Sequence, residues 1–141
     1  MLVNQIAVFL ENRSGRIAEF SKVLADANIN IRAMSIADTE EYGILRAITD
    51  DNVRAVETLK INGFNASATD LIGFNVADKP GEMFKVLSIL EKAKINIGYL
   101  YSFAGANKEN AIILIKVDDN EKTAAILESN GINLMGRDLP I

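Results

Sequence analysis

Short apolar runs alternate with segments in which apolar residues recur every three or four positions. The run "NQIAVFLEN" (residues 4–12) has the pattern of a β-strand. A turn containing Gly15 follows, and helical spacing then links the apolar residues Ile17, Phe20, Leu24 and Ala27. Two more strands are predicted, at about residues 29–37 and in "GILRAIT" (43–49).

The rest of this first half predicts a second helix and a last strand. Asp50-Asp51 supplies an N-cap and favourable charge at the helix start, and Gly63 ends the helix. The strand is "FNASATD" (64–70). The order of elements is therefore βαββαβ.

The same pattern then recurs. Ile29-Asn30-Ile31 and Ile95-Asn96-Ile97 lie 66 positions apart (95 − 29 = 66), and Gly15 falls on Gly81 at this offset. "TDDN" matches "VDDN" at an offset of 68 (117 − 49 = 68), so the second copy has two additional residues near "FAGANKEN". We therefore predict an internal duplication, with domains at residues 1–70 and 71–141 and no linker between them.

The second copy predicts the same elements. Its strands are "LIGFNVAD" (71–78), about 95–103, "NAIILIKV" (110–117) and "INLMGRD" (132–138). Its first helix is marked by Met83, Val86 or Leu87, Leu90 and Ala93, and its second runs from Asp118-Asp119 to Gly131. The predicted fold class is α+β: two tandem ferredoxin-like units, each an antiparallel sheet with two helices on one face.

Composition removes several classes of function. The chain of 141 residues has no Cys and no His, which excludes thiolate nucleophiles, imidazole bases and zinc sites built on these residues. Its net charge is −4 and its 15 Lys and Arg are scattered, so neither nucleic acid nor a membrane is expected as a partner. The first residues show no secretory leader, and a cytoplasmic location is expected.

No motif predicts catalysis, a metal or a cofactor. Glycine-rich phosphate loops are absent from the sequence, and the third strand of each copy has no aromatic residue for stacking on RNA bases. The acidic pairs are interpreted as N-caps, and Glu40-Glu41 as solvated surface. Alternating aromatic residues on one strand indicate sheet packing or a subunit interface, with ligand contact as the alternative: Tyr99, Tyr101 and Phe103.

Two stretches carry a family resemblance, "LENRSGRIAEFSKVLADANINI" (10–31) and "VADKPGEMFKVLSILEKAKINI" (76–97). Each has a first strand, a polar turn ending in Gly, a helix and a strand opening with Asn-Ile. They resemble the ACT domain, a regulatory module that binds amino acids. The whole chain is similar to small bacterial proteins made of two ACT domains, some of them named acetolactate-synthase-like.

The resemblance implies a set of ligand-binding residues in each copy. Serine-binding ACT domains hold their ligand with an Asn in the turn and the Asn of the Asn-Ile strand, which correspond to Asn12 and Asn30. The alternative role for both is local hydrogen bonding. The predicted binding residues are Asn12, Arg13, Ser14, Gly15 and Asn30, and in the second copy Asp78, Lys79, Pro80, Gly81 and Asn96.

The two copies are not expected to be equivalent. Asn12 can serve both charged ends of a zwitterion, whereas Asp78 only accepts hydrogen bonds when ionised. Pro80 removes a backbone N–H that Ser14 keeps. The His that serine-binding ACT domains have two residues before the turn Asn is Leu10 here, which favours a more apolar ligand side chain.

The function expected from the sequence is non-catalytic regulation. We expect a homodimer that binds an amino-acid-like effector at the turns, in a cleft at a contact between units or chains, and that acts on a metabolic enzyme. The alternatives are a structural or protein-interaction module without a ligand, and a small enzyme.

Overall fold

The computed structural model describes residues 1–38 and 41–139. Its helices and strands follow the predicted order, with one strand shared between the two copies. Among the described residues, no helix is long and apolar enough to cross a membrane. The elements are β1 (Val3–Glu11), α1 (Arg16–Asp26), β2 (Ile31–Asp38), β3 (Tyr42–Thr49), α2 (Asn52–Ile61), β4 (Asn65–Ala77), α3 (Glu82–Lys92), β5 (Ile97–Ala104), β6 (Asn110–Val117), α4 (Asn120–Ser129) and β7 (Leu134–Met135).

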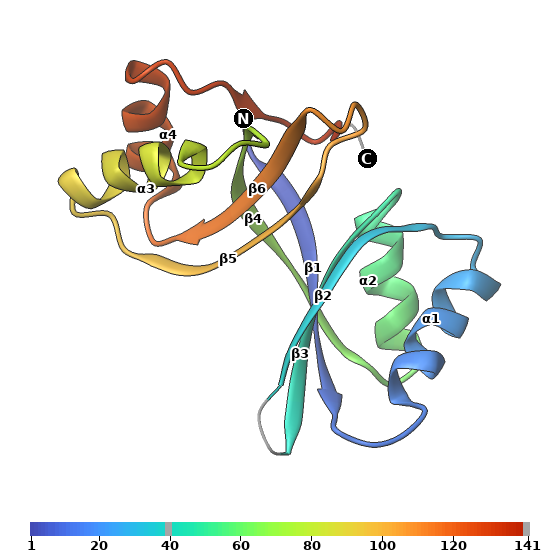
Figure 1. The fold of residues 1–141 in the computed structure, drawn as a ribbon. Helices are drawn as coiled ribbons and strands as arrows, with labels where there is room; N and C mark the ends of the chain where they lie inside the picture. Colours follow the sequence, from blue (N-terminus) through green and yellow to red (C-terminus); the bar gives the residue numbers. More distant parts are fainter. Residues whose placement is uncertain (39–40, 140–141) are drawn as a thin grey trace. The chain divides into compact units, whose positions relative to one another are not determined.

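Residues 4–69 form one compact unit, called here the N-terminal unit. Its strands lie in the order β2-β3-β1-β4, and β1 and β2 both pair antiparallel with β3. Helices α1 and α2 contact each other on one face of these strands (Figure 1). The core between helices and strands consists of Ile6, Val8, Leu10, Phe20, Leu24, Ile29, Leu45, Ala47, Ala55, Leu59, Phe64 and Ala66.

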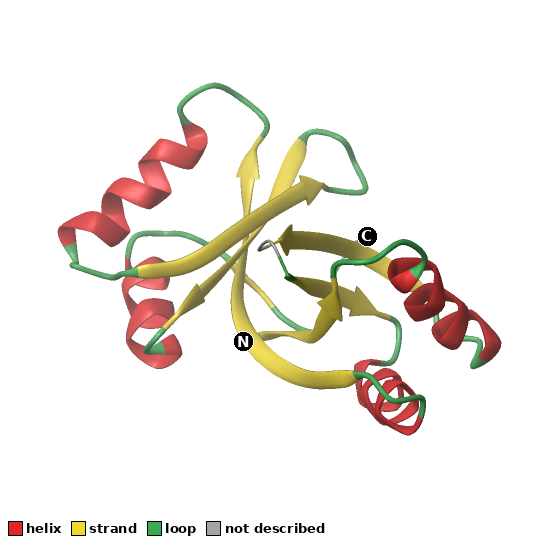
Figure 2. Ribbon diagram, turned by 90° about the horizontal axis from the view of Figure 1, so that it is seen from below, coloured by secondary structure: helices red, strands yellow, loops and turns green. Residues whose placement is uncertain are grey.

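Residues 1–3 and 70–141 form the second compact unit, the C-terminal unit. Its strands lie in the order β5-β6-β4, and β7 also pairs antiparallel with β4. Helices α3 and α4 again contact each other on one face (Figure 2). The second core consists of Ile72, Phe74, Val76, Val86, Leu90, Ile113, Ile115, Val117, Leu127 and Leu134. The α+β class with two tandem ferredoxin-like units is thus confirmed.

The predicted helix boundaries of α2 and α4 are confirmed. The Asp51 carboxylate accepts a hydrogen bond from the Arg54 N–H (3.1 Å), and the Asp119 carboxylate accepts one from the Lys122 N–H (2.9 Å). These contacts satisfy backbone donors that a helix start leaves open. Gly63 and Gly131 follow the helix ends in left-handed conformation, with φ of +83° and +80°.

Three predicted strands were wrong in extent. The strands expected at 64–70 and 71–78 are one continuous strand, β4, because no turn interrupts the chain there. Gly73 does not break it: a side chain at this position would meet Cγ2 of Val3 at 2.7 Å, so the glycine allows close packing inside the sheet. The strand expected at 132–138 is only the two residues of β7.

Candidate functional site

The turn between β1 and α1, residues 12–15, is called here the N-terminal turn. All four of its residues are exposed. Gly15 begins the helix with φ of +86°, a conformation that a residue with a Cβ adopts only under strain. Gly15 has no side chain to cap α1, and the N–H of Arg16 donates to the carbonyl of Arg13 (3.3 Å). Such a helix start favours an anion such as a carboxylate.

A hollow of about 60 Å³ lies beside this turn. Residues 10–13 line it together with Ile17, Ile36 and Gly43. Leu10 is 3% exposed and forms its floor, whereas Ile17 and Ile36 are 46% and 39% exposed. Ile36 faces the helix side of the sheet, because its β3 neighbour Leu45 belongs to the core. We call this space the aliphatic hollow, since three of its walls are aliphatic side chains.

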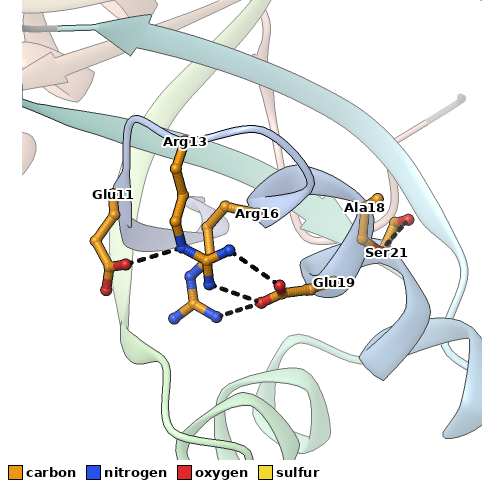
Figure 3. Close-up of polar contacts among 6 residues, drawn as sticks. All are labelled: Glu11, Arg13, Arg16, Ala18, Glu19 and Ser21. Atoms are coloured by element: carbon orange, nitrogen blue, oxygen red, sulfur yellow. Dashed lines mark hydrogen bonds and ion pairs between the residues drawn. The ribbon is translucent and has the colours of Figure 1, made fainter.

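The charged side chains around the turn pair with one another (Figure 3). Arg13 donates from Nε to Glu11 (3.1 Å) and from Nη1 to Glu19 (3.2 Å), and Arg16 donates to Glu19 (2.8 Å). The hydrogen bonds from Arg16 and then Arg13 hold the pKa of Glu19 below its usual value. Hydrogen bonds to Glu19 and then Glu11 raise the pKa of Arg13. Two arginines and two glutamates thus form a cluster without net formal charge.

Arg16 also ties the start of α1 to the start of β4. Its guanidinium carbon lies 4.0 Å from the centre of the Phe64 ring, and Phe64 meets Phe20 edge to face in the core. Nε of Arg16 is buried without a hydrogen-bond partner, so the ring face and Glu19 are its principal interactions. This packing fixes the position of the helix start on which the turn depends.

Asn30 does not lie near Asn12 within the N-terminal unit. The Asn12 N–H donates to the carbonyl of Glu41, at the start of β3 (3.0 Å), whereas Asn30 accepts from the Asp50 N–H, just after β3 (3.1 Å). Asn12 thus lies beside the first residue of β3, and Asn30 lies beside its last. Because β3 has eight residues, its two ends are roughly 25 Å apart. The two predicted ligand asparagines of one unit therefore lie at opposite ends of its sheet.

The second predicted set lies on the corresponding turn of the C-terminal unit, residues 78–81, called here the C-terminal turn. Its four residues and Asn96 are exposed. Gly81 begins α3 with φ of +88°, again without a side-chain cap. The ion pair beside this turn has its charges exchanged. Glu82 stands at the position of Arg16 and Lys85 at the position of Glu19, and the two form an ion pair (2.7 Å). As in the first copy, Asn96 precedes the edge strand and lies at the far end of α3 from the turn.

The side chains around the two turns differ more than the turns themselves. The strand registers place Val76 where the first copy has Leu10, and Ala111 where it has Gly43. Ile36 pairs with Leu45 in the first copy, and Ser102 pairs with Ile113 at the equivalent position of the second copy. The second copy therefore has a hydroxyl where the first has a branched aliphatic side chain.

Sequence reasoning missed most of the aliphatic hollow. The helical spacing placed Ile17 on the apolar side of the first helix, and the structure shows that this side chain is 46% exposed and borders the hollow. Ile36 and Gly43 come from two strands far from the turn in sequence, and only their registers bring them beside it. An alignment of the two copies could have pointed to these positions, because the second copy has Ser102 in place of Ile36 and Ala111 in place of Gly43.

Two copies of a ferredoxin-like unit, each with an exposed glycine turn at an uncapped helix start, define a tandem module with two candidate binding turns. The family model described as "ACT domain pair" matches residues 1–139, and the chain belongs to this family. The resemblance to ACT domains is thereby confirmed. No curated protein matches the chain.

Solved structures show the same architecture. Protein BT0572 from Bacteroides thetaiotaomicron is 38% identical, with a TM-score of 0.89 over 96% of this chain and 92% of that one. The regulatory subunit of aspartate kinase from Thermus thermophilus, in its ligand-free form, is 17% identical, with a TM-score of 0.66 over 92% of each chain. The corresponding subunit from Thermus flavus is 18% identical, with a TM-score of 0.66 over 92% of this chain and 91% of that one.

Proposed function

We propose that the chain is a non-catalytic regulatory protein that binds a small amino-acid-like effector at the N-terminal turn. The observation that carries this proposal is the uncapped start of α1 at Gly15, with Asn12 beside it and the aliphatic hollow next to both. The helix start would receive the effector's carboxylate. The amide of Asn12 would serve both charged ends.

The C-terminal turn is the weaker site in this proposal. Asp78 would repel the effector's carboxylate when ionised, and Pro80 offers no backbone N–H where Ser14 has one. Lys79 corresponds to Arg13 and so gives the second turn no advantage in charge. Gly81 keeps the helix start open, which is why the turn remains a candidate binding site.

We further propose that the effector site is completed by a second copy of the chain. Asn30 lies at the far end of its own unit from Asn12, and β2 lies at an edge of the sheet. If two β2 strands pair antiparallel, Asn30 of the partner subunit comes close to the N-terminal turn. A homodimer would also cover an exposed strand edge, which folded proteins seldom leave unprotected.

Regulation would follow from the effector's preference for one of two states of a partner enzyme. A subunit of similar fold regulates aspartate kinase in Thermus thermophilus, as its name states. We propose a metabolic enzyme as the partner and the cytoplasm as the location. A protein-interaction module without a ligand is the second candidate, favoured by the ion pairs that occupy Arg13 at the rim of the turn.

The test is a calorimetric screen of the full chain against the common amino acids. We expect one or more to bind, and Asn12→Ala to weaken binding tenfold to a hundredfold, as expected for the loss of about 1.5–3 kcal/mol in hydrogen bonds to charged groups. Asp78→Ala, the matched variant of the C-terminal turn, should change the affinity little. Absence of binding by every amino acid would favour the interaction module, and turnover of a bound compound would show an enzyme.

A further inference from the structure

Two arginines hold one carboxylate at the rim of the N-terminal turn (Figure 3). Nη1 and Nη2 of Arg13 donate to the two oxygens of Glu19, each at 3.2 Å, and Nη1 of Arg16 donates to one of these oxygens at 2.8 Å. The contact of one guanidinium with both oxygens is the geometry in which arginine binds a carboxylate most strongly. The turn thus already holds a carboxylate, and this carboxylate belongs to the chain itself.

Arg13 is the side chain for which an effector would compete. Its Nε donates to Glu11 (3.1 Å), while its Nη1 and Nη2 are both engaged with Glu19. Arg13 also lines the aliphatic hollow, so the same guanidinium borders the space beside the turn. The carboxylate of an effector at the turn could bind the Nη1 and Nη2 donors only if Glu19 released them.

The release of Arg13 would not leave Glu19 without a partner. The guanidinium of Arg16 is packed on the Phe64 ring at 4.0 Å, and the Arg16 side chain is only 14% exposed, so Arg16 stays beside Glu19. The Arg13 side chain is 48% exposed and can turn away into solvent. The hydrogen bonds from Arg16 and then Arg13 lower the pKa of Glu19, which keeps the carboxylate ionised at neutral pH. The contact can therefore open by movement of Arg13 alone.

We propose that the contact between Arg13 and Glu19 is autoinhibitory, because Arg13 must leave Glu19 before it can bind the carboxylate of an effector. This inference rests on the proposed function, since it adds a regulatory contact to that same site. Exposed ion pairs are weak, so the contact lowers the affinity for the effector without preventing binding. Glu19 acts as a built-in competitor of the effector.

The C-terminal turn lacks this contact. Lys79 stands at the position of Arg13. The position of Glu19 is taken by Lys85, which has the same charge as Lys79 and cannot pair with it. No ion pair in the described part of the chain involves Lys79. The autoinhibitory contact therefore belongs to the N-terminal turn alone.

Glu19→Gln should raise the affinity for a carboxylate ligand, because it removes the charge that holds Arg13. The gain is the inverse of the fraction of molecules in which Arg13 is released. An exposed ion pair shifts such an equilibrium about two- to fivefold, and this is the expected gain. The gain should vanish when Arg13 is absent, so Arg13→Ala and the double variant should bind with equal affinity.

The experiment titrates acetate, and each amino acid that binds in the calorimetric screen, into the full chain. Wild type, Glu19→Gln, Arg13→Ala and the double variant are compared as a double-mutant cycle, and acetate binding is followed by the amide NMR signals of residues 12–19. Glu11→Gln is the matched control, because it removes the same charge from Nε of Arg13 rather than from Nη1 and Nη2, and it should change the affinity less than about twofold. Asp26→Asn, at the other end of α1, controls for net charge.

The outcomes separate this inference from the proposed function. A gain from Glu19→Gln that persists without Arg13 would show simple repulsion between Glu19 and the ligand, and would overturn the autoinhibitory contact. An equal gain in Glu11→Gln, or no gain in Glu19→Gln, would overturn it as well, while amino-acid binding that depends on Asn12 would leave the proposed function standing. If no amino acid binds, the proposed function fails, and the acetate titrations still decide whether Glu19 competes for Arg13.

Discussion

Asn52 and Asn120 occupy the same place in the two copies, but only Asn52 has partners for its side-chain oxygen. Oδ1 of Asn52 accepts from the N–H and from the hydroxyl of Thr49, both at 2.9 Å, and its Nδ2 donates to the carbonyl of Asn4 (2.8 Å). In the second copy Val117 replaces Thr49, and Oδ1 of Asn120 is buried without a partner. The asparagine that recurs in both copies therefore accepts two hydrogen bonds in the first copy and none in the second.

We expect Asn52→Ala to lower the free energy of unfolding by about 1–3 kcal/mol, because it leaves the buried donors of Thr49 without an acceptor. Asn120→Ala should change it by less than about 1 kcal/mol, since no acceptor bond is lost. Urea unfolding of the two variants, followed by circular dichroism, measures the difference. An equal loss in both variants would show that the bonds to Thr49 contribute little.

Single residues were predictable from the sequence where their role is local. The N-caps Asp51 and Asp119 bond to a donor three residues away, so the local sequence is sufficient to place them. The hollow was not predictable in this way, because Ile36 and Gly43 reach it only through strand pairing. The roles of Asn12 and Asn30 remain predictions, and their separation in one unit became visible only through the register of β2 and β3.

At the scale of elements, the four helices described end in two different ways. α2 and α4 are followed by Gly63 and Gly131, which take the left-handed conformation without a steric penalty. α1 and α3 are followed by Asn28 and Lys94, with φ of 57° and 56°. Asparagine tolerates this conformation, but lysine does not favour it. The end of α3 is therefore the most strained of the four.

Lys94→Gly should accordingly stabilise the protein by about 0.5–1 kcal/mol, because it removes the steric penalty of the left-handed conformation. The matched control is Lys92→Gly at the last residue of α3, which should destabilise the protein by up to about 1 kcal/mol through loss of helix propensity. Thermal or urea unfolding compares the two variants. If Lys94→Gly were as destabilising as Lys92→Gly, backbone strain would not matter at this end.

Element order was predictable because each element carries its own periodicity and boundary residues. The extent of the strands was less predictable. The predicted boundary between 70 and 71 falls inside β4, where the pattern of "SATDLIGFNVAD" contains no turn and Gly73 serves packing. The central residues of β6, Ile112 to Ile115, are all buried, whichever face of the strand they lie on. Apolar and polar residues therefore do not alternate there, and the sequence pattern does not show which residues face the helices.

At the scale of the whole molecule, duplication has kept the framework and changed the sites. Each unit has its own core and its own glycine turn. Residues at and beside the turns differ between the copies, and so do core positions such as Phe20 and its counterpart Val86. The aromatic stripe Tyr99, Tyr101 and Phe103 lies half-buried on the edge strand β5, and its role as an interface remains a prediction.

A mixed dimer tests whether two chains build one effector site. In a dimer of one Asn12→Ala chain and one Asn30→Ala chain, one site carries both substitutions. The other combines the intact Asn12 of one chain with the intact Asn30 of the partner subunit. We expect this hybrid, isolated with two different affinity tags, to bind the amino acid found in the screen at one site per dimer with wild-type affinity. Each parental homodimer should be weakened tenfold to a hundredfold at both of its sites.

The parental homodimers and the wild-type dimer, which should bind at two sites, are the controls for stoichiometry. Sedimentation must show twice the chain mass of 15.4 kDa for every preparation, because a monomer could not share a site between chains. A hybrid weakened at both sites would mean that each chain uses its own Asn12 and Asn30. That result would contradict the proposal, which rests on the separation of roughly 25 Å between the two ends of β3. Loss of binding in Asn96→Ala, but not in Asn30→Ala, would instead show that β5 of the second copy lies beside the turn.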